Sequence, residues 1–433
     1  MEGYSLYRNF SSPLSNIFFQ QDLNRIFAKN PFLCYILFQK MNNELKIGVI
    51  GTGGRGSLAK HAHNPEKGTR IVAGADISEK ALVEFRKEYG PDVFTTKNYR
   101  KLLDRPDINA VFVTSPDFLH EEHAVAALEA GKSVYLEKPM AITIEGCDHI
   151  LQTAFERRAK LYLGHNMRHM SFILKMKKLV DQGSIGEVKA GWCRHFVCYG
   201  GDAYFKDWHA ERSKSTSLLL QKGAHDIDVL HWLCGGYTVR VNAVGGLTLY
   251  DRINDRHSPS EQGDTSWRLS NWPPLFQKGL NPVIDVEDIN MMLMQLDNGV
   301  FASYQQCHYT PDGWRNYTII GTEGRIENFG DSPGKCVVRL WNRRNNYNPY
   351  GDEQYYIPLA EGSHGGADPK IVGEFIRYVK NGEKITTSAI AARNSVAAGC
   401  LAAHSLRNGG IPLDVPKVPD KIATYFNADL AGK

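Results

Sequence analysis

The sequence lacks three features that would each have indicated a particular class of protein. Its eight cysteines include no Cys-x-x-Cys pair and no dense framework, which argues against a zinc ribbon or a disulfide scaffold and favours a reducing, cytoplasmic location. No apolar run reaches the length of about 20 residues that a transmembrane helix needs, so no membrane partner is expected. The 51 basic and 47 acidic residues nearly balance, which argues against a nucleic-acid partner. What remains is a globular composition over 433 residues, enough for about two domains of roughly 100–200 residues each.

The N-terminal segment 1–40 differs in character from the rest of the chain. It is rich in Phe and Tyr, shows no clear periodicity and has no small-residue cleavage site after its apolar run, so it does not resemble a signal peptide. Met41 stands directly before a strong strand pattern. We therefore expect residues 1–40 to be a translated leader, with an arm that packs on the body as the alternative.

Short apolar strands and helical patterns alternate after Met41. The clearest strands cover 45–50, 71–75, 110–114, 133–136 and 161–164. Helical spacing lies between them, over 79–89, 121–130 and 144–158. Strands that alternate with helices predict βαβ units, so we expect an α/β domain with a doubly wound parallel sheet over residues 41–165.

The pattern changes in the remaining part of the chain. Segments 290–296 and 300–306 alternate with a period of two, which is typical of strands with one face on the core and one in water. A long polar stretch over 251–285 has the length of a functional or oligomer-forming loop. We expect an α+β domain with a large mixed or antiparallel sheet over residues 166–433.

A glycine-rich turn follows the first strand and opens a helix. Its residues are Gly51, Thr52, Gly53, Gly54, Arg55 and Gly56. In a dinucleotide site of this pattern, the first glycine permits the tight turn, the second admits the pyrophosphate and the third lets the helix pack on the strand. We therefore expect all six residues to bind a dinucleotide, with a glycine-rich turn without a ligand as the alternative.

Asp76 stands at the end of the second strand, 20 residues after Gly56. A carboxylate at this place accepts hydrogen bonds from the adenosine ribose and repels a 2′-phosphate. This favours NAD as the cofactor. NADP remains possible because Ser78 and Lys80 follow closely.

The third strand leads into a second candidate cofactor segment. Ser115, Pro116 and His120 follow its carboxyl end, where ligands of doubly wound sheets bind, and His120 is expected to lie against the cofactor. His120 and His123 superficially resemble a zinc helix. They stand three residues apart instead of four and have no third ligand, so we expect no metal.

Glu137 and Lys138 directly follow the fourth strand, before Pro139. A lysine there would lie near the nicotinamide end of the cofactor, where burial and a neighbouring cationic ring lower its pKa. It could then hydrogen-bond the reacting oxygen and share its proton. The alternative is a surface lysine in a turn.

His225 and Asp228 stand three residues apart in a helical segment, which places them on one helix face. A carboxylate so placed can orient an imidazole, and the imidazole can act as a base. The alternative is a helix end whose polar groups face solvent.

Taken together, these motifs resemble the Gfo/Idh/MocA family, which includes glucose–fructose oxidoreductase and inositol dehydrogenases. The resemblance rests on the segment from Val111 to Pro139, on the helix with His225 and on the segment 317–324. It implies a Rossmann domain followed by a sheet domain that binds substrate and makes homo-oligomer contacts. It also implies a cis Lys138–Pro139 bond, Lys138 in the role of the family's lysine and His225 as the base.

Gln221 departs from this family pattern. Inositol dehydrogenases have an aspartate four residues before the histidine, and a neutral amide stabilises an imidazolium less well than a carboxylate does. Either Asp228 takes over that role, or the substrate is not inositol. Trp208 and His209, together with Gln221, are the candidate residues for a sugar pocket.

The resulting hypothesis is an NAD(P)-dependent oxidoreductase that moves a hydride between the nicotinamide and a hydroxyl-bearing carbon of a sugar or polyol. One alternative is a glycosidase of the same superfamily that uses NAD transiently. The other is a non-catalytic dinucleotide sensor that regulates a partner, although a sensor needs neither Lys138 nor His225.

Overall fold

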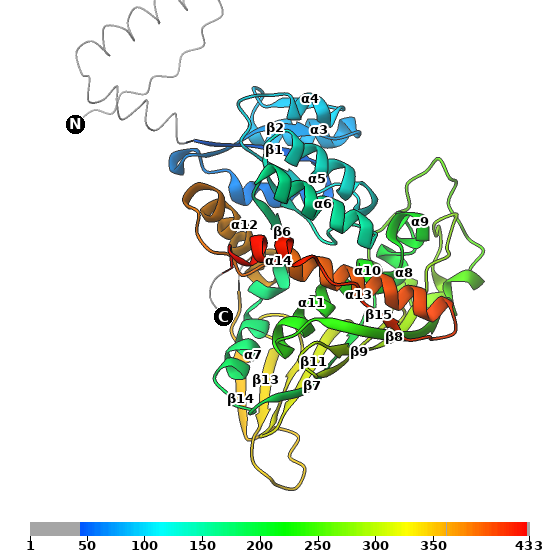
Figure 1. Cartoon of the computed structure of the whole chain (residues 1–433). Coiled ribbons are helices and arrows are strands. Elements are labelled where there is room, and N and C mark those ends of the chain that lie inside the picture. Colours follow the sequence, from blue (N-terminus) through cyan, green and yellow to red (C-terminus); the bar gives the residue numbers. More distant parts are fainter. Residues whose placement is uncertain (1–43, 361, 431–433) are drawn as a thin grey trace, which may run out of the picture.

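The computed structural model describes residues 44–360 and 362–430. The predicted leader, residues 1–40, lies outside the described residues. Two sheets, one above the other in Figure 1, are joined by the long helix α13 (Ala389–Arg407), which packs on both parts of the molecule.

The first sheet is parallel and has the strand order β3-β2-β1-β4-β5-β6. Its strands are β1 (Leu45–Ile50), β2 (Thr69–Ala75), β3 (Phe94–Thr96), β4 (Ala110–Val113), β5 (Ser133–Leu136) and β6 (Leu161–Leu163). The helices of this part are η1 (Gly54–Ala62), η2 (Pro65–Lys67), α3 (Glu79–Tyr89), α4 (Tyr99–Leu103), η3 (Asp117–Leu119), α5 (His120–Glu129) and α6 (Ile144–Arg157). Every residue of β4 is buried, as expected for a strand covered on both faces. This confirms the predicted doubly wound α/β fold, and it adds the short strand β3, which the sequence pattern did not reveal.

The second sheet is mixed and has the order β14-β13-β12-β11-β7-β10-β9-β8-β15. Its strands are β7 (Val188–Phe196), β8 (Thr238–Gly246), β9 (Ile289–Leu296), β10 (Phe301–Cys307), β11 (Trp314–Gly321), β12 (Arg325–Phe329), β13 (Cys336–Trp341), β14 (Glu353–Ile357) and β15 (Leu413–Asp414). Strands β7 and β10 pair in parallel, and the other neighbours are antiparallel. Along β9 buried and exposed residues alternate, so one face of the sheet packs on the core and the other is open. The predicted α+β part is confirmed.

The remaining helices follow β6 in the chain, and only some of them pack on the inner face of this sheet. They are η4 (Asn166–His169), α7 (Ser171–Asp181), α8 (Gly200–Ala203), η5 (Trp208–Ala210), α9 (Arg212–Ser215), α10 (Leu218–Gln221), α11 (Gly223–Cys234), α12 (Ser363–Asn381) and α14 (Asp420–Asn427). Short turns η6 (Tyr250–Arg252), η7 (Leu269–Asn271) and η8 (Pro274–Phe276) interrupt the long loop between β8 and β9.

The C-terminal helices pack back on the first sheet. Ile371 and Phe375 of α12 belong to the same buried cluster as Ile47 of β1, and Phe426 of α14 packs with the core around α6. Helices from beyond the predicted domain boundary at residue 165 therefore complete the core around the first sheet. A prediction based on local pattern missed this because nothing in the sequence of α12 states which sheet it covers.

Candidate active site

The glycine-rich turn has the shape that a dinucleotide requires. A side chain at Gly51, whose φ is +87°, would come within 2.6 Å of the Ser115 backbone, and a Cβ at Gly56 would lie 2.2 Å from the Gly51 carbonyl oxygen. By contrast, a Cβ at Gly53 would meet nothing closer than 3.7 Å, and one at Gly54 nothing within 4 Å. Two glycines thus close the turn, while the other two leave open space beside it, into which a pyrophosphate fits.

Asp76 is bound to this turn through backbone amides. Its Oδ2 accepts hydrogen bonds from the Thr52 amide at 2.8 Å and the Gly53 amide at 3.2 Å, and its Oδ1 accepts one from the Ser78 amide at 2.9 Å. Its Oδ2 also accepts a longer bond of 3.4 Å from the Thr52 hydroxyl, whereas Oδ1 has one contact and two lone pairs, so it can accept a hydrogen bond from a ribose hydroxyl.

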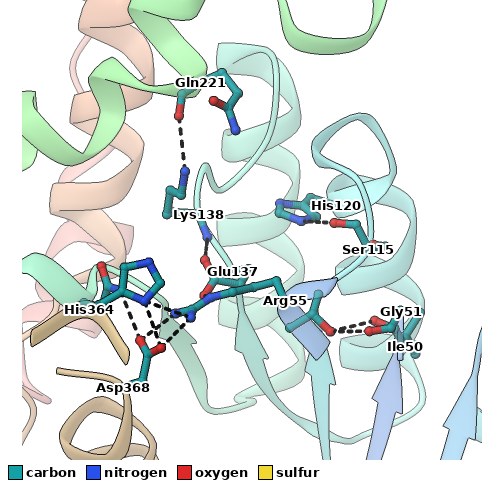
Figure 2. A network of polar contacts seen from close by, with 12 residues as sticks. Ile50, Gly51, Arg55, Ser115, His120, Glu137, Lys138, Gln221, His364 and Asp368 are labelled. Carbon is teal, nitrogen blue, oxygen red and sulfur yellow. Dashed lines mark hydrogen bonds and ion pairs between the residues drawn. The ribbon is translucent and has the colours of Figure 1, made fainter. Parts of the chain in front are cut away.

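Arg55 belongs to the glycine-rich motif but points away from the turn. Figure 2 shows its guanidinium between Glu137 and Asp368, with N–O distances of 2.6 Å and 2.7 Å. Burial would lower the pKa of Arg55, but the carboxylates of Glu137 and Asp368 outweigh burial and raise it. Arg55 therefore ties the turn to β5 and α12. Its predicted direct role in cofactor binding stays a prediction.

Glu137 connects this arginine to the lysine beside it. Its Oε2 accepts a hydrogen bond from the Lys138 amide at 2.8 Å, while its Oε1 binds Arg55. His364, from the kinked start of α12, lies 2.9 Å from Asp368 and completes the group seen in Figure 2. Asp368 and His364 were missed by sequence reasoning because they lie more than 300 positions from Arg55 along the chain.

His120 joins two loops at the sheet edge. Its two ring nitrogens lie 2.6 Å from the Pro139 carbonyl oxygen and 2.8 Å from the Ser115 carbonyl oxygen, and the residue is 1% exposed. Both nitrogens hold the Ser115–Pro116 loop beside the Lys138–Pro139 loop, and the contact of the His120 ring with the cofactor stays a prediction. The Lys138–Pro139 bond is cis, as the family resemblance implied.

Lys138 is half-buried at the centre of the site, where Figure 2 shows it pointing toward Gln221. Its Nζ lies 3.4 Å from the Gln221 backbone oxygen. Burial lowers the pKa of Lys138 to about 8; Asp117 raises it and Lys222 lowers it further. Near pH 7 this lysine is thus mostly charged, yet its proton is easily shared.

His225, the predicted base, makes no ion pair with a carboxylate. Its Nδ1 is buried and has no hydrogen-bond partner among the described residues. Burial, followed by the positive charges of Lys138 and Arg315, lowers the pKa of His225 well below its usual value. The imidazole is therefore neutral and has an accepting nitrogen available, as a base must.

Asp228 does not orient His225, and the prediction that it takes over this task is corrected. Its carboxylate accepts two hydrogen bonds from Arg168, at 2.7 Å and 2.8 Å, and its Oδ2 lies 3.3 Å from Nδ1 of His165. The physical reason is that α11 is buried on nearly every face, so a carboxylate on it must pair with the nearest cation.

The neighbouring Asp226 holds a second buried network. It lies 2.9 Å from both His195 and Arg315 and also accepts from the hydroxyls of Tyr304 and Tyr317. Burial opposes its ionisation, but Arg315 and His195 outweigh burial and lower the pKa of Asp226. This network fixes α11 against the second sheet, just behind His225.

Asp117 is a further site residue, to which the sequence pattern assigned no role. It is 6% exposed, and its Oδ2 has no partner among the described residues. Burial raises the pKa of Asp117, against the opposing effects of His120, Lys138 and His209. A buried carboxyl beside Lys138 and His209 is a candidate contact for a substrate hydroxyl.

Aromatic rings form a wall beside these groups. Phe118 and Trp208 lie 5.7 Å apart, Trp208 stacks on His209 at 3.7 Å, and His209 meets Tyr204 at 5.2 Å. Gln221 is 5% exposed, and its Oε1 has no hydrogen-bond partner in the part of the chain that the structure describes. The predicted substrate residues Trp208, His209 and Gln221 thus surround the region of Asp117 and Lys138, while their contact with a sugar stays a prediction.

Within the part of the chain that the structure describes, no group of three or more His, Cys, Asp or Glu side chains could hold a metal ion. Among the same residues, no helix is both long and apolar enough to cross a membrane.

Comparison with known proteins identifies both parts of the chain. Residues 45–165 match the model described as an oxidoreductase family NAD-binding Rossmann fold, and residues 177–415 match that family's C-terminal alpha/beta domain. The NAD(P) cofactor expected from the glycine-rich turn is thereby confirmed.

Two relatives illustrate the range of similarity. The chain is 27% identical to YteT of Bacillus subtilis, named as an oxidoreductase, over 62% of this chain and 72% of that protein. It is 33% identical to inositol 2-dehydrogenase of Gluconacetobacter diazotrophicus over 46% of this chain, which spans only 57% of the relative's length. A solved levoglucosan dehydrogenase in complex with NADH and levoglucosan has the same fold, with a TM-score of 0.70 and 20% identity over 86% of this chain and 100% of that one. The chain thus belongs to the Gfo/Idh/MocA family of NAD-binding oxidoreductases.

Proposed function

We propose that this protein is an NAD(P)-dependent dehydrogenase that oxidises a hydroxyl-bearing carbon of a sugar or polyol. The observation that carries the proposal is the juxtaposition of a neutral, buried imidazole at His225 with an ammonium at Lys138, whose pKa is lowered by burial to about 8. Oxidation of an alcohol needs an acceptor for the hydroxyl proton and a donor that stabilises the oxygen as it becomes negative.

The two side chains divide this work. When bound, NAD(P)⁺ supplies the acceptor for the hydride. His225 accepts the hydroxyl proton at a ring nitrogen, while the Lys138 ammonium donates a hydrogen bond to the same oxygen. Because Lys138 and Arg315 make His225 a weak base, proton removal depends on Lys138 also lowering the pKa of the bound hydroxyl.

The rest of the site positions these groups. The Glu137 carboxylate holds the Lys138 backbone amide, and the Arg55 guanidinium holds Glu137. The ring wall from Phe118 to Tyr204 offers flat apolar faces suited to the apolar side of a sugar ring. Asp76, at the open side of the glycine-rich turn, favours NAD over NADP because its charge repels a 2′-phosphate.

We further infer that the protein assembles as a homo-oligomer through the open face of the second sheet. Val244, Met291, Leu293 and Phe301 are between 45% and 64% exposed on three adjacent strands, and Val244 and Met291 are paired across β8 and β9. Contiguous apolar surface of this kind is typical of an interaction site.

The decisive experiment is a panel of sugars and polyols, each incubated with NAD⁺ or NADP⁺ while the reduced nicotinamide absorbance is followed. A dehydrogenase releases NADH or NADPH in proportion to substrate consumed. A glycosidase that uses NAD transiently would consume its glycoside without net NADH, and a dinucleotide sensor would turn over nothing.

A further inference from the structure

Lys222 occupies a place in the fold that is unfavourable for a lysine. It lies between α10 and α11, at the N-cap of α11, and is 8% exposed. Helix N-termini favour anions and the side chains of Ser, Thr, Asp or Asn, because the first amides and the helix dipole are positive there. A buried cation at this position is therefore not explained by the stability of the helix.

The ammonium of Lys222 has few partners. Its Nζ donates to the Tyr199 hydroxyl at 3.1 Å and lies over the Tyr199 and Tyr204 rings at 5.4 Å and 5.3 Å. Among the described residues it forms no ion pair with a carboxylate. Buried lysines are nearly always paired, and an ammonium has three N–H donors. The hydroxyls of Tyr199 and Tyr204 account for two of these donors, so one remains for a ligand.

Lys222 also lies within the electrostatic reach of the reacting groups. Its charge lowers the pKa of Lys138 and of His225. Tyr204, one of the two rings beneath the ammonium, packs against His209 at 5.2 Å and so belongs to the aromatic wall. The cation therefore stands at one end of the aromatic wall that has Trp208 and Phe118 at its other end.

The surrounding charge is predominantly positive. Arg315 is neutralised by Asp226 and Asp331. Lys138 faces Asp117, whose buried carboxyl has a raised pKa. Lys222 forms no ion pair with a carboxylate among the described residues, and in a buried site an added negative charge would interact with it far more strongly than in water.

We propose that Lys222 binds an anionic substituent of the substrate, so that the enzyme acts on a sugar carrying a carboxylate or a phosphate. This inference rests on the proposed dehydrogenase function and names its substrate class. A lysine is a point charge without the two-pronged geometry of arginine, so the shared requirement is a negative charge. The alternative role of Lys222, which is only to keep His225 neutral, would affect charged and neutral substrates alike.

The test compares matched sugars: D-glucuronate, D-glucose 6-phosphate and D-glucose, and likewise D-galacturonate and D-galactose. We expect the wild type to oxidise an anionic member with a kcat/KM at least about tenfold above its neutral counterpart, and Lys222→Gln to reduce that preference about 10- to 100-fold, chiefly through KM. Lys222→Arg should keep most of it. Lys189→Gln, which changes an exposed lysine on β7, is the matched control and should keep all of it.

The outcomes separate the two proposals. A preference for the uronates assigns a carboxylate, and a preference for the 6-phosphate assigns a phosphate. Turnover with equal or better use of the neutral sugars by the wild type overturns the inference but leaves the dehydrogenase intact. So does an unchanged preference in Lys222→Gln. Absence of turnover with every sugar would contradict the proposed function itself. If Lys222→Gln does not fold, the preference for anionic over neutral sugars is compared between the wild type and Lys222→Arg. Loss of the preference in Lys222→Arg, or its absence in the wild type, then overturns the inference.

Discussion

At the scale of single residues, the role of each buried carboxylate depends on the cation with which it forms an ion pair. Asp226 and Asp228 both belong to α11, yet the first binds Arg315 and His195 and the second binds Arg168. Neither forms a hydrogen bond with His225. The basicity of His225 is therefore set by burial and by nearby cations, and the two aspartates hold the helix in place.

Asp228→Asn tests this division of roles. The substitution leaves the Arg168 guanidinium buried without its counter-charge, so we expect the free energy of unfolding in urea to fall by about 3–5 kcal/mol. Asp181→Asn, which breaks the exposed pair with Lys177, is the control and should cost less than about 1 kcal/mol. Unchanged stability together with a shifted pH profile would instead return Asp228 to the task of orienting His225.

Asp76→Ala tests cofactor choice. Removing the carboxylate takes away a charged acceptor for ribose hydroxyls and the repulsion of a 2′-phosphate, so NAD affinity should fall about tenfold or more while NADP affinity rises. Titration of cofactor fluorescence measures both. Glu79→Ala, an exposed carboxylate on the following helix, should change neither. A wild type that prefers NADP by tenfold would show that Asp76 has been misinterpreted.

At the scale of elements, different glycines of the glycine-rich turn serve cofactor binding and folding. Gly53 has an extended backbone with φ −79°, and a side chain there meets no close atom, so Gly53→Val should fold normally but block the pyrophosphate and abolish NAD binding. Gly56→Ala places a Cβ against the Gly51 carbonyl and should lower stability by about 1–3 kcal/mol. Thermal melts measure the stability of both variants, and NAD titration measures their affinity for the cofactor. Tight NAD binding by Gly53→Val would contradict the placement of the cofactor.

What the sequence could predict differs between elements for physical reasons. The glycine turn, Asp76 and Lys138 follow buried strands directly, so local pattern and the common edge of a parallel sheet placed them. The partner of Asp228 is Arg168, 60 positions earlier, and that of Arg55 is Asp368, 313 positions later. A spacing of three residues on a helix shows only that two side chains share a face. It does not show which neighbour from another element reaches them first, and for this reason His225 was paired with the wrong group.

At the scale of the whole molecule, the proposed assembly uses the open face of the second sheet. Leu293→Asp places a charge in the middle of this apolar surface and should shift the protein toward monomers in sedimentation or light scattering. Gln295→Asp, at an exposed position further along β9, is a milder control on the same strand. A wild type that is monomeric at micromolar concentration would contradict the assembly.

The pH profile of kcat/KM for sugar oxidation by the wild type, Lys138→Ala and His225→Ala tests the central claim most directly. Lys138 is charged below its pKa of about 8, so the wild-type rate should fall as the pH rises through that value, and this limb should disappear in Lys138→Ala. Each variant should lose about 10²–10⁴-fold in kcat while NAD affinity stays within a few-fold. An active His225→Ala enzyme with an unchanged profile would contradict the account and assign the base to Lys138 or His209.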